Sequence, residues 1–173
     1  MLRERTSGTL ERLMSLPISK ADLLGGYALA FGLLAAVQAA VVCTVGFTLL
    51  SLDAPHGPWL VGLLAIGNAL LGMALGLFAS AFARTEFQAV QFMPAIVFPQ
   101  LLLCGLFVPR STMAAPLRAV ARAFPLTYAF DALSRATHDA NLGGGFVVDV
   151  AVVVGATFVA LAFGALTLRR RTA

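Results

Sequence analysis

Residues 59–83 read WLVGLLAIGNALLGMALGLFASAFA and contain no Asp, Glu, Lys, Arg or His. A helix needs about 20 mostly apolar residues to cross the hydrocarbon core of a bilayer. Three further stretches are similarly apolar, at residues 23–52, 87–108 and 146–168. The first two also lack charged residues and histidine, and the last contains one acid, Asp149. The sequence therefore predicts an all-α integral membrane protein with four transmembrane helices.

The composition excludes an ordinary soluble enzyme. Of 173 residues, 60% are hydrophobic and 12% are charged, and the mean hydropathy is +0.91. A soluble domain carries roughly a quarter of charged residues. Cys43 and Cys104 lie inside apolar runs, which favours two small buried hydrophobic residues over a disulfide or a metal site. The chain opens with charged residues and not with a short apolar core, so a signal peptide is not predicted.

The distribution of Lys and Arg predicts the orientation in the membrane. If both termini are cytoplasmic, the inner side holds Arg3, Arg5, Arg12, Lys20, Arg84, Arg169, Arg170 and Arg171. The outer side then holds four arginines and four acids, which are Arg110, Arg118, Arg122, Arg135, Asp53, Asp131, Asp139 and Asp149. The whole net charge of +4 falls on the cytoplasmic side. Membrane topology thus explains the basic character of the chain, and nucleic-acid binding is not predicted.

Two predicted spans carry features beyond simple hydrophobicity. Asn68, Gly72, Gly76 and Ser80 are four residues apart, so they share one face of the second helix, and residues 72–76 form a GxxxG pattern. Such a face lets two helices approach closely in lipid, either within one subunit or between two. A similar stripe, Ala156, Ala160 and Gly164, lies on the last helix.

The third span holds polar amides and two prolines, namely Gln88, Gln91, Gln100, Pro94 and Pro99. Amides at this depth need partners or water. They line a translocation path or bond to neighbouring helices.

Residues 109–145 are too polar to span the membrane, and their pattern predicts two short helices. Ser111 caps a first helix that runs to Phe124, with Arg118 and Arg122 on one face, and Pro125 ends it.

The second of these helices is capped by Thr127, and Asp131 and Arg135 form an i,i+4 pair on it. Residues 143–145, all glycine, provide a flexible hinge into the last span. Two amphipathic half-helices between spans predict an interfacial or re-entrant hairpin on the outer side.

The first 22 residues predict a short amphipathic helix on the cytoplasmic side. Leu10, Leu13 and Met14 recur at helical spacing, Pro17 ends the run, and residues 19–22 form a capping box for the first span. The short helix could lie on the membrane surface or dock into the groove of a partner.

Signatures of catalysis are missing from the sequence. Lys20 is the only lysine and does not follow a glycine, which excludes a Walker A loop. His56 and His138 are far apart and lack other metal ligands. There is no GxSxG elbow, and Asp149 alone cannot form an intramembrane proton relay. We predict neither catalytic nor metal-binding residues.

Two motifs carry a resemblance to a known family. Residues 3–19 read RERTSGTLERLMSLPIS, and residues 104–109 and 124–133 read CGLFVP and FPLTYAFDAL. Together they resemble the permease subunits of ABC-2 type ABC exporters, of the drug and antibiotic efflux kind found in actinobacteria. The basic tail at residues 169–171 is also similar.

The resemblance implies roles for both motifs. The first would be the coupling helix that receives movement from a separate ATPase subunit; its residues are Gly8, Thr9, Leu10, Glu11, Arg12, Leu13, Met14 and Pro17. The second would form external re-entrant helices acting as a lid or anchor; its residues are Gly105, Pro109, Phe124, Pro125, Leu126, Thr127, Tyr128 and Asp131.

The resemblance also implies a function and its partners. The chain would be a permease subunit in a bacterial plasma membrane that moves a drug-like, lipid or other substrate outward. It would pair with an ABC ATPase, which binds the ATP, and with a second permease subunit, while binding no cofactor itself. The four spans would correspond to spans three to six of a six-span domain, through an internal start or a gene fragment. The alternative is a non-transporting structural or assembly subunit.

Overall fold

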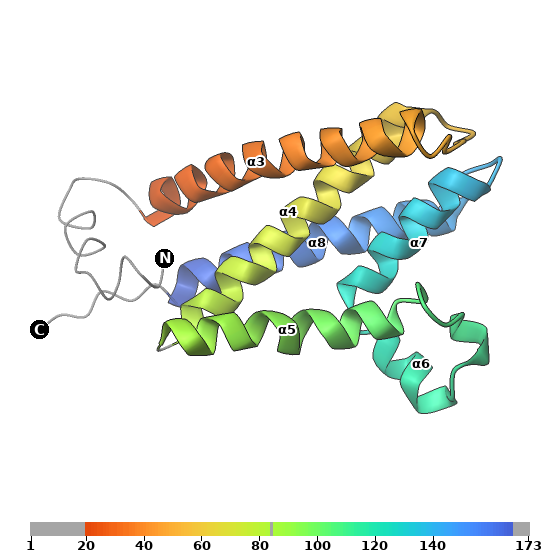
Figure 1. Cartoon of the computed structure of the whole chain (residues 1–173). Helices are drawn as coiled ribbons and strands as arrows, with labels where there is room; N and C mark the ends of the chain where they lie inside the picture. Colours follow the sequence, from red (N-terminus) through yellow and green to blue (C-terminus); the bar gives the residue numbers. More distant parts are fainter. Residues whose placement is uncertain (1–19, 84, 168–173) are drawn as a thin grey trace, which may run out of the picture.

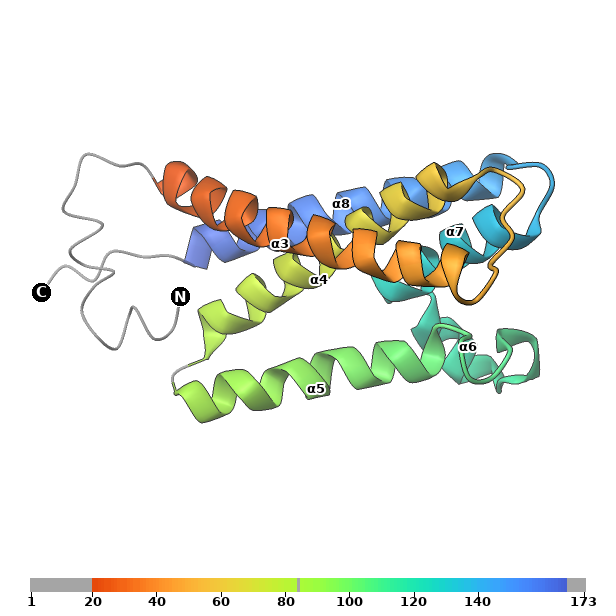
Figure 2. The same ribbon diagram turned by 45° about the horizontal axis from the view of Figure 1, so that its top comes forward.

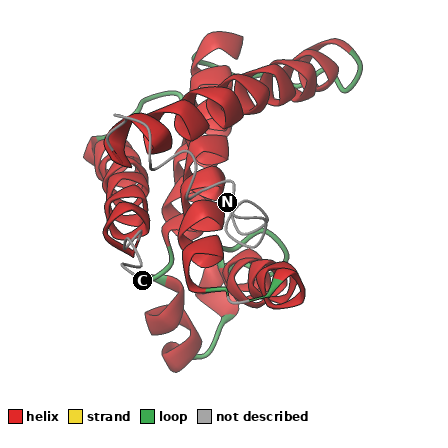
Figure 3. Cartoon of the chain, turned by 90° about the vertical axis from the view of Figure 1, so that its left-hand side faces the viewer, coloured by secondary structure: helices red, strands yellow, loops and turns green. Residues whose placement is uncertain are grey.

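The fold is entirely helical in a computed structural model that describes residues 20–83 and 85–167. Its elements are α3 (Lys20–Thr48), α4 (Pro58–Phe82), α5 (Glu86–Leu103), the short 3-10 helix η1 (Arg110–Thr112), α6 (Ala115–Ala121), α7 (Pro125–His138) and α8 (Gly144–Thr167) (Figures 1 and 3). The predicted all-α fold class is confirmed. The predicted cytoplasmic helix and basic tail lie outside the described residues.

Three helices are long and apolar enough to cross a membrane. Their apolar segments are Ala28–Thr48 in α3, Pro58–Ser80 in α4 and Gly144–Gly164 in α8. The third predicted span, 87–108, is a shorter helix, because α5 has 18 residues and its apolar part is only Val90–Leu103. Its first turns hold Glu86 and two glutamines, which lower the hydropathy there.

Two predicted spans end too late, and backbone turns explain both differences. The span predicted at 23–52 ends at Thr48 in the structure, because Ser51 adopts a left-handed conformation with φ 51°. The span predicted to Val108 ends at Leu103, because Gly105 has φ 107°. A positive φ terminates a helix, and at 107° glycine is the residue that adopts it without strain.

The helix α4 is the centre of the bundle. Leu71 on α4 packs with Ala129 on α7 and Val153 on α8 to form the buried hydrophobic cluster. Small residues bring the flanking helices close: a Cβ atom at Gly32 of α3 would lie 3.4 Å from Leu70, and one at Gly164 of α8 would lie 3.9 Å from the backbone of Phe78. The stripe that ends at Gly164 therefore faces α4.

The connections fall at two ends of the bundle. The loops between α3 and α4, between α5 and α7, and between α7 and α8 gather at one end, while α3 begins and α8 ends at the other (Figures 1 and 2). At the loop end, Nε2 of His56 lies 3.0 Å from the backbone oxygen of Asp139 and joins the first loop to the last. The helix α5 stands apart from α3 in both views.

Candidate functional site

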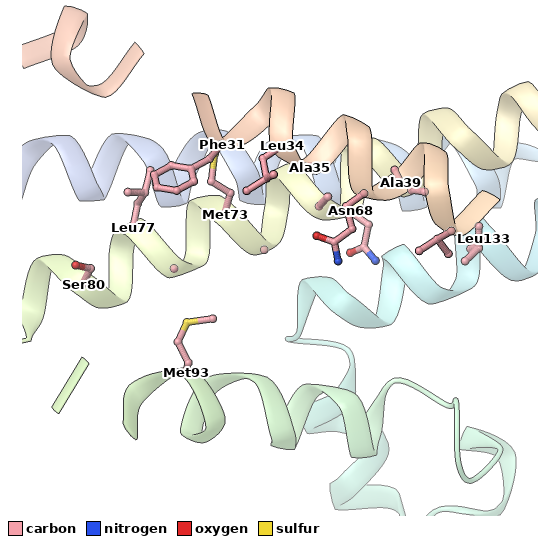
Figure 4. Close-up of a pocket in the computed structure, with 16 residues that line it drawn as sticks. Phe31, Leu34, Ala35, Ala39, Asn68, Met73, Leu77, Ser80, Met93 and Leu133 are labelled. Atoms are coloured by element: carbon pink, nitrogen blue, oxygen red, sulfur yellow. The ribbon is translucent and has the colours of Figure 1, made fainter. Parts of the chain in front are cut away.

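A groove of about 750 Å³ runs between α3, α4, α5 and α7 (Figure 4). The lining residues are Phe31, Leu34, Ala35, Gln38, Ala39, Val42, Ala65, Asn68, Ala69, Gly72, Met73, Gly76, Leu77, Ser80, Met93 and Leu133. A volume of this size is typical of small-molecule sites. No charged side chain is among the lining residues, so the groove offers no ionic partner to an occupant.

The small-residue face predicted on the second span forms the floor of this groove. All four of its residues, Asn68, Gly72, Gly76 and Ser80, are in the lining. A Cβ atom at Gly72 would meet nothing within 4 Å, and one at Gly76 would meet only the Met93 sulfur at 3.9 Å. The floor is deep because these side chains are small. Its use for packing between helices stays a prediction.

Two carboxamides and the hydroxyl of Ser80 supply the polar character of the groove. Gln38 comes from α3 and Asn68 from α4, and neither amide has a hydrogen-bond partner among residues 20–83 and 85–167. The amide of Asn68 projects into the space in front of α4 (Figure 4). An occupant of the groove can therefore donate to or accept from these amides.

The other glutamine of interest, Gln100, is buried in α5 and not in the groove lining. It is 4% exposed, and its Nε2 donates to the backbone oxygen of Ile96 at 3.0 Å. Its Oε1 has no partner in the described part of the chain. Gln100 shows neither of the two uses predicted for the span glutamines, because it does not line the groove and its hydrogen bond lies within its own helix.

At the loop end, Arg110 and Asp131 form an ion pair that joins two elements of the predicted hairpin. Nη2 of Arg110 donates to both carboxylate oxygens of Asp131, at 2.5 and 2.6 Å. Gly105 lies beside this pair, since a Cβ atom there would be in ordinary van der Waals contact, 3.5 Å from Arg110 and 3.4 Å from Phe130. The pair fastens η1, which Pro109 precedes, to the middle of α7.

A second ion pair joins α7 to α8. Nε of Arg135 donates to Oδ2 of Asp149 at 3.0 Å, and Asp149 is 5% exposed. Gly145 lies against the guanidinium, and a Cβ atom there would be 3.1 Å from its central carbon. The predicted pair of Asp131 with Arg135 is therefore wrong, because each residue bonds to a partner on another element. Gly145 provides space for Arg135 within the first turn of α8.

The contact between α6 and α7 also differs from the prediction. Thr127 lies inside α7, whose N-cap is Phe124, and makes no cap. Instead, its hydroxyl donates to the backbone oxygen of Ala121 at 2.6 Å, and the Tyr128 hydroxyl donates to that of Arg122 at 2.8 Å. These bonds satisfy carbonyls at the end of α6, which lack partners within the helix.

The predicted first helix of the hairpin is shorter than expected. Ser111 lies in η1 and caps nothing, and α6 begins only at Ala115, since Met113 has an extended backbone. Pro125 does not end the first helix as predicted, because α6 already ends at Ala121 and Pro125 is the first residue of α7.

The sequence alone did not reveal the partners of Arg110 and Arg135. One signal was available: Asp149 is the only acid in its span, and a carboxylate at that depth requires a cation. The nearest upstream arginine is Arg135.

The remaining predicted site residues divide into two groups. Leu126 packs against the buried cluster. Residues 8–14 and Pro17, the predicted coupling residues, lie outside the described residues. In the described part, no group of three His, Cys, Asp or Glu could hold a metal ion.

Comparisons with known proteins agree on one family. A family model described as ABC-2 type transporter matches residues 1–137. A curated relative, "ABC transporter G family member 20" of Dictyostelium discoideum, is 28% identical over 112 residues. The match covers 65% of this chain but only 15% of that relative. No solved structure matches the chain.

Proposed function

The chain belongs to the ABC-2 type transporter family, and we propose that it is the permease part of an exporter whose ATP is hydrolysed by a separate subunit. It is a multi-pass membrane protein and carries the transmembrane part of such a transporter. The proposed substrate is drug-like, lipid or otherwise apolar, and it leaves across a bacterial plasma membrane.

The groove is the observation that carries this proposal. It is lined by side chains without charge, and two carboxamides with free hydrogen-bonding capacity face the same space. A path of this chemistry suits a substrate that is mostly apolar and has a few neutral polar groups. Phosphates or carboxylates would find no cation in it.

The helix α3 links the groove to the proposed coupling segment. It forms one wall of the groove and begins at Lys20, directly after the segment that ends with Pro17. Only 6% of its apolar segment is buried, against 28% for α4. A helix with so little burial can shift against its neighbour at low cost. We infer that movement of the ATPase subunit reaches the groove through α3.

In this proposal the helices α4, α7 and α8 form a fixed body, and α3 moves against it. They share the buried cluster around Leu71, and the pair of Arg135 with Asp149 holds α7 against α8. Packed cores and networks of this kind move as units. In the proposed mechanism the hairpin is an external anchor, and α3 moves relative to it.

The membrane arrangement follows from the same proposal. The helix α5 would be the fourth span, since its 18 residues extend ~27 Å. The start of α3 and the end of α8 lie at the same end of the bundle, which supports both termini being on one side of the membrane. The excess of Lys and Arg on that side supports a cytoplasmic location for it. A second permease subunit would complete the path.

Capture of the ATPase subunit tests the function. The tagged chain is purified from membranes of its native cells, and the captured proteins are assayed for a Walker A subunit and for vanadate-sensitive ATP hydrolysis. We expect both, and we expect Glu11→Arg or deletion of residues 10–14 to abolish them while membrane insertion is retained. Glu4→Arg, outside the proposed coupling residues, provides a control with the same change in charge. If no ATPase is captured with the unaltered chain, the structural-subunit alternative replaces the permease.

A further inference from the structure

Four arginines lie between α5 and α8, and they differ in their partners. Arg110 and Arg135 are bonded to carboxylates. Arg118 and Arg122 have no side-chain hydrogen bond or ion pair within residues 20–83 and 85–167. Both are exposed. Two exposed positive charges at the end of one short helix are therefore available to an external anion.

These two arginines belong to an amphipathic surface. They are four residues apart at the end of α6 and therefore share a face. Leu117 and Val120 on the same helix are each 47% exposed, and Ala121 alone is buried. A helix with basic residues on one side and exposed aliphatic residues on the other is typical of the membrane interface.

The loop before α6 extends the apolar part of this surface. Leu106, Phe107 and Val108 are 53%, 63% and 47% exposed. They follow directly on the end of α5, where that helix leaves the hydrocarbon core if it spans the membrane. In Figures 1 and 2, α6 lies at the loop end and to the side of the bundle, below the α3, α4 and α8 group. This position suits contact with lipid.

The orientation of α6 is fixed by α7. The hydroxyls of Thr127 and Tyr128 donate to the last carbonyls of α6, at Ala121 and Arg122. The arginine side chains therefore project from a helix that is held in place. A pair of arginines on a fixed helix loses less entropy on binding an anion than a pair on a mobile loop.

We propose that α6 and residues 106–108 lie in the interface of the outer leaflet, where Arg118 and Arg122 bind the phosphates of acidic phospholipids. Guanidinium groups pair well with phosphate through parallel hydrogen bonds. The headgroup boundary also provides hydrocarbon for the adjacent Leu117, Val120 and Phe107. An acidic protein partner would match the charge but not the apolar side chains beside it. The site does not depend on transport, but its place in the outer leaflet rests on the membrane arrangement proposed above.

The test uses tryptophan quenching by brominated lipids. The full chain carries Trp59→Phe and Leu117→Trp, so that its only tryptophan lies on α6. It is placed in phosphatidylcholine vesicles with an equal small fraction of either brominated phosphatidylglycerol or brominated phosphatidylcholine. An attraction of ~1 kcal/mol for each arginine corresponds to about fivefold local enrichment of the acidic lipid per arginine. We expect brominated phosphatidylglycerol to quench more strongly.

Two controls separate this site from general charge attraction. Arg118→Gln with Arg122→Gln should make quenching by the two lipids equal, whereas Ala115→Gln with Ala119→Gln, at exposed positions of the same helix, should keep the preference. The native Trp59, at the start of α4, should show no preference. Equal quenching with both arginines present would overturn the proposal, as would a preference that survives their removal. Absence of quenching by either lipid would show that α6 does not contact the membrane.

Discussion

The ion pair between Arg135 and Asp149 makes a quantitative prediction about stability. A hydrogen bond to a charged group contributes roughly 1.5–3 kcal/mol. Because the Arg135 side chain is 41% exposed, solvent weakens the interaction, and we expect a coupling free energy of about 1–2 kcal/mol. The local pair of Asp131 with Arg135, which the structure does not contain, should show a coupling near zero.

The single substitutions should also differ from one another. The Asp149 side chain is 8% exposed and loses the cation that it bonds in Arg135→Ala, which should cost on the order of 3 kcal/mol. In Asp149→Ala, the Arg135 side chain can turn to water, so the cost should be smaller. The same reasoning predicts coupling of Arg110 with Asp131, whose side chains are 33% and 16% exposed.

Double-mutant cycles provide the assay. The free energy of unfolding is measured for the full chain in mixed micelles with increasing SDS, with Trp59 fluorescence as the signal. The cycles pair Arg135→Ala with Asp149→Ala, and Arg135→Ala with Asp131→Ala. A larger coupling in the second cycle than in the first would refute the assignment of partners, and so would an equal cost of the two single substitutions in the first.

Three further predictions concern the backbone, the hairpin and the groove. Gly105→Ala should lower the unfolding free energy by about 1–2 kcal/mol in the same SDS titration, because φ at this residue is 107°. Thr127→Val should cost about 1–3 kcal/mol, because the carbonyl of Ala121 loses its donor; Thr127→Ser should retain most of the stability. Gly72→Leu should abolish efflux of an uncharged lipophilic dye from cells that express the whole transporter, with protein levels unchanged, because the added side chain fills the groove. Gly67→Leu is the matched control, since its Cβ also meets nothing within 4 Å and it is not a lining residue; equal loss of efflux in both variants would contradict the role of the groove.

Periodicity and hydropathy predicted the long helices well. The long apolar runs predicted α4 and α8 correctly, because a membrane-length apolar segment has few alternatives to a helix. Their ends were less predictable. Ser51 and Gly105 reverse the chain through positive φ angles, and residues on either side of them are as apolar as those within the helices.

The contacts within the hairpin could not be predicted from the spacing of residues along the chain. Asp131 and Arg135 have the spacing of a helical ion pair, yet each bonds to a residue outside α7, 21 and 14 positions away. Thr127 stands where a helix cap is expected, but its hydroxyl is buried and donates to a backbone oxygen of α6. Such partners depend on how α7 packs against its neighbours, and no rule based on spacing contains that information.

Of the groove, only the floor could be predicted from the sequence. The face with Gly72 and Gly76 was evident from spacing, but its surroundings were not. The walls come from α3, α5 and α7, and their positions depend on packing around α4. The same small residues that permit close helix packing also leave a hollow where no helix covers them.

The central claim is that α3 moves against a fixed body of α4, α7 and α8 when the ATPase subunit acts. Spin labels at exposed positions Leu33 of α3 and Val154 of α8 report that movement, and labels at Leu63 of α4 and Val147 of α8 report the body. Distances are measured by pulsed electron resonance in the complete transporter, without nucleotide and after trapping with ATP and vanadate. If α3 moves as proposed, the first distance changes and the second does not. A first distance that stays constant, or two distances that change together, would contradict the claim.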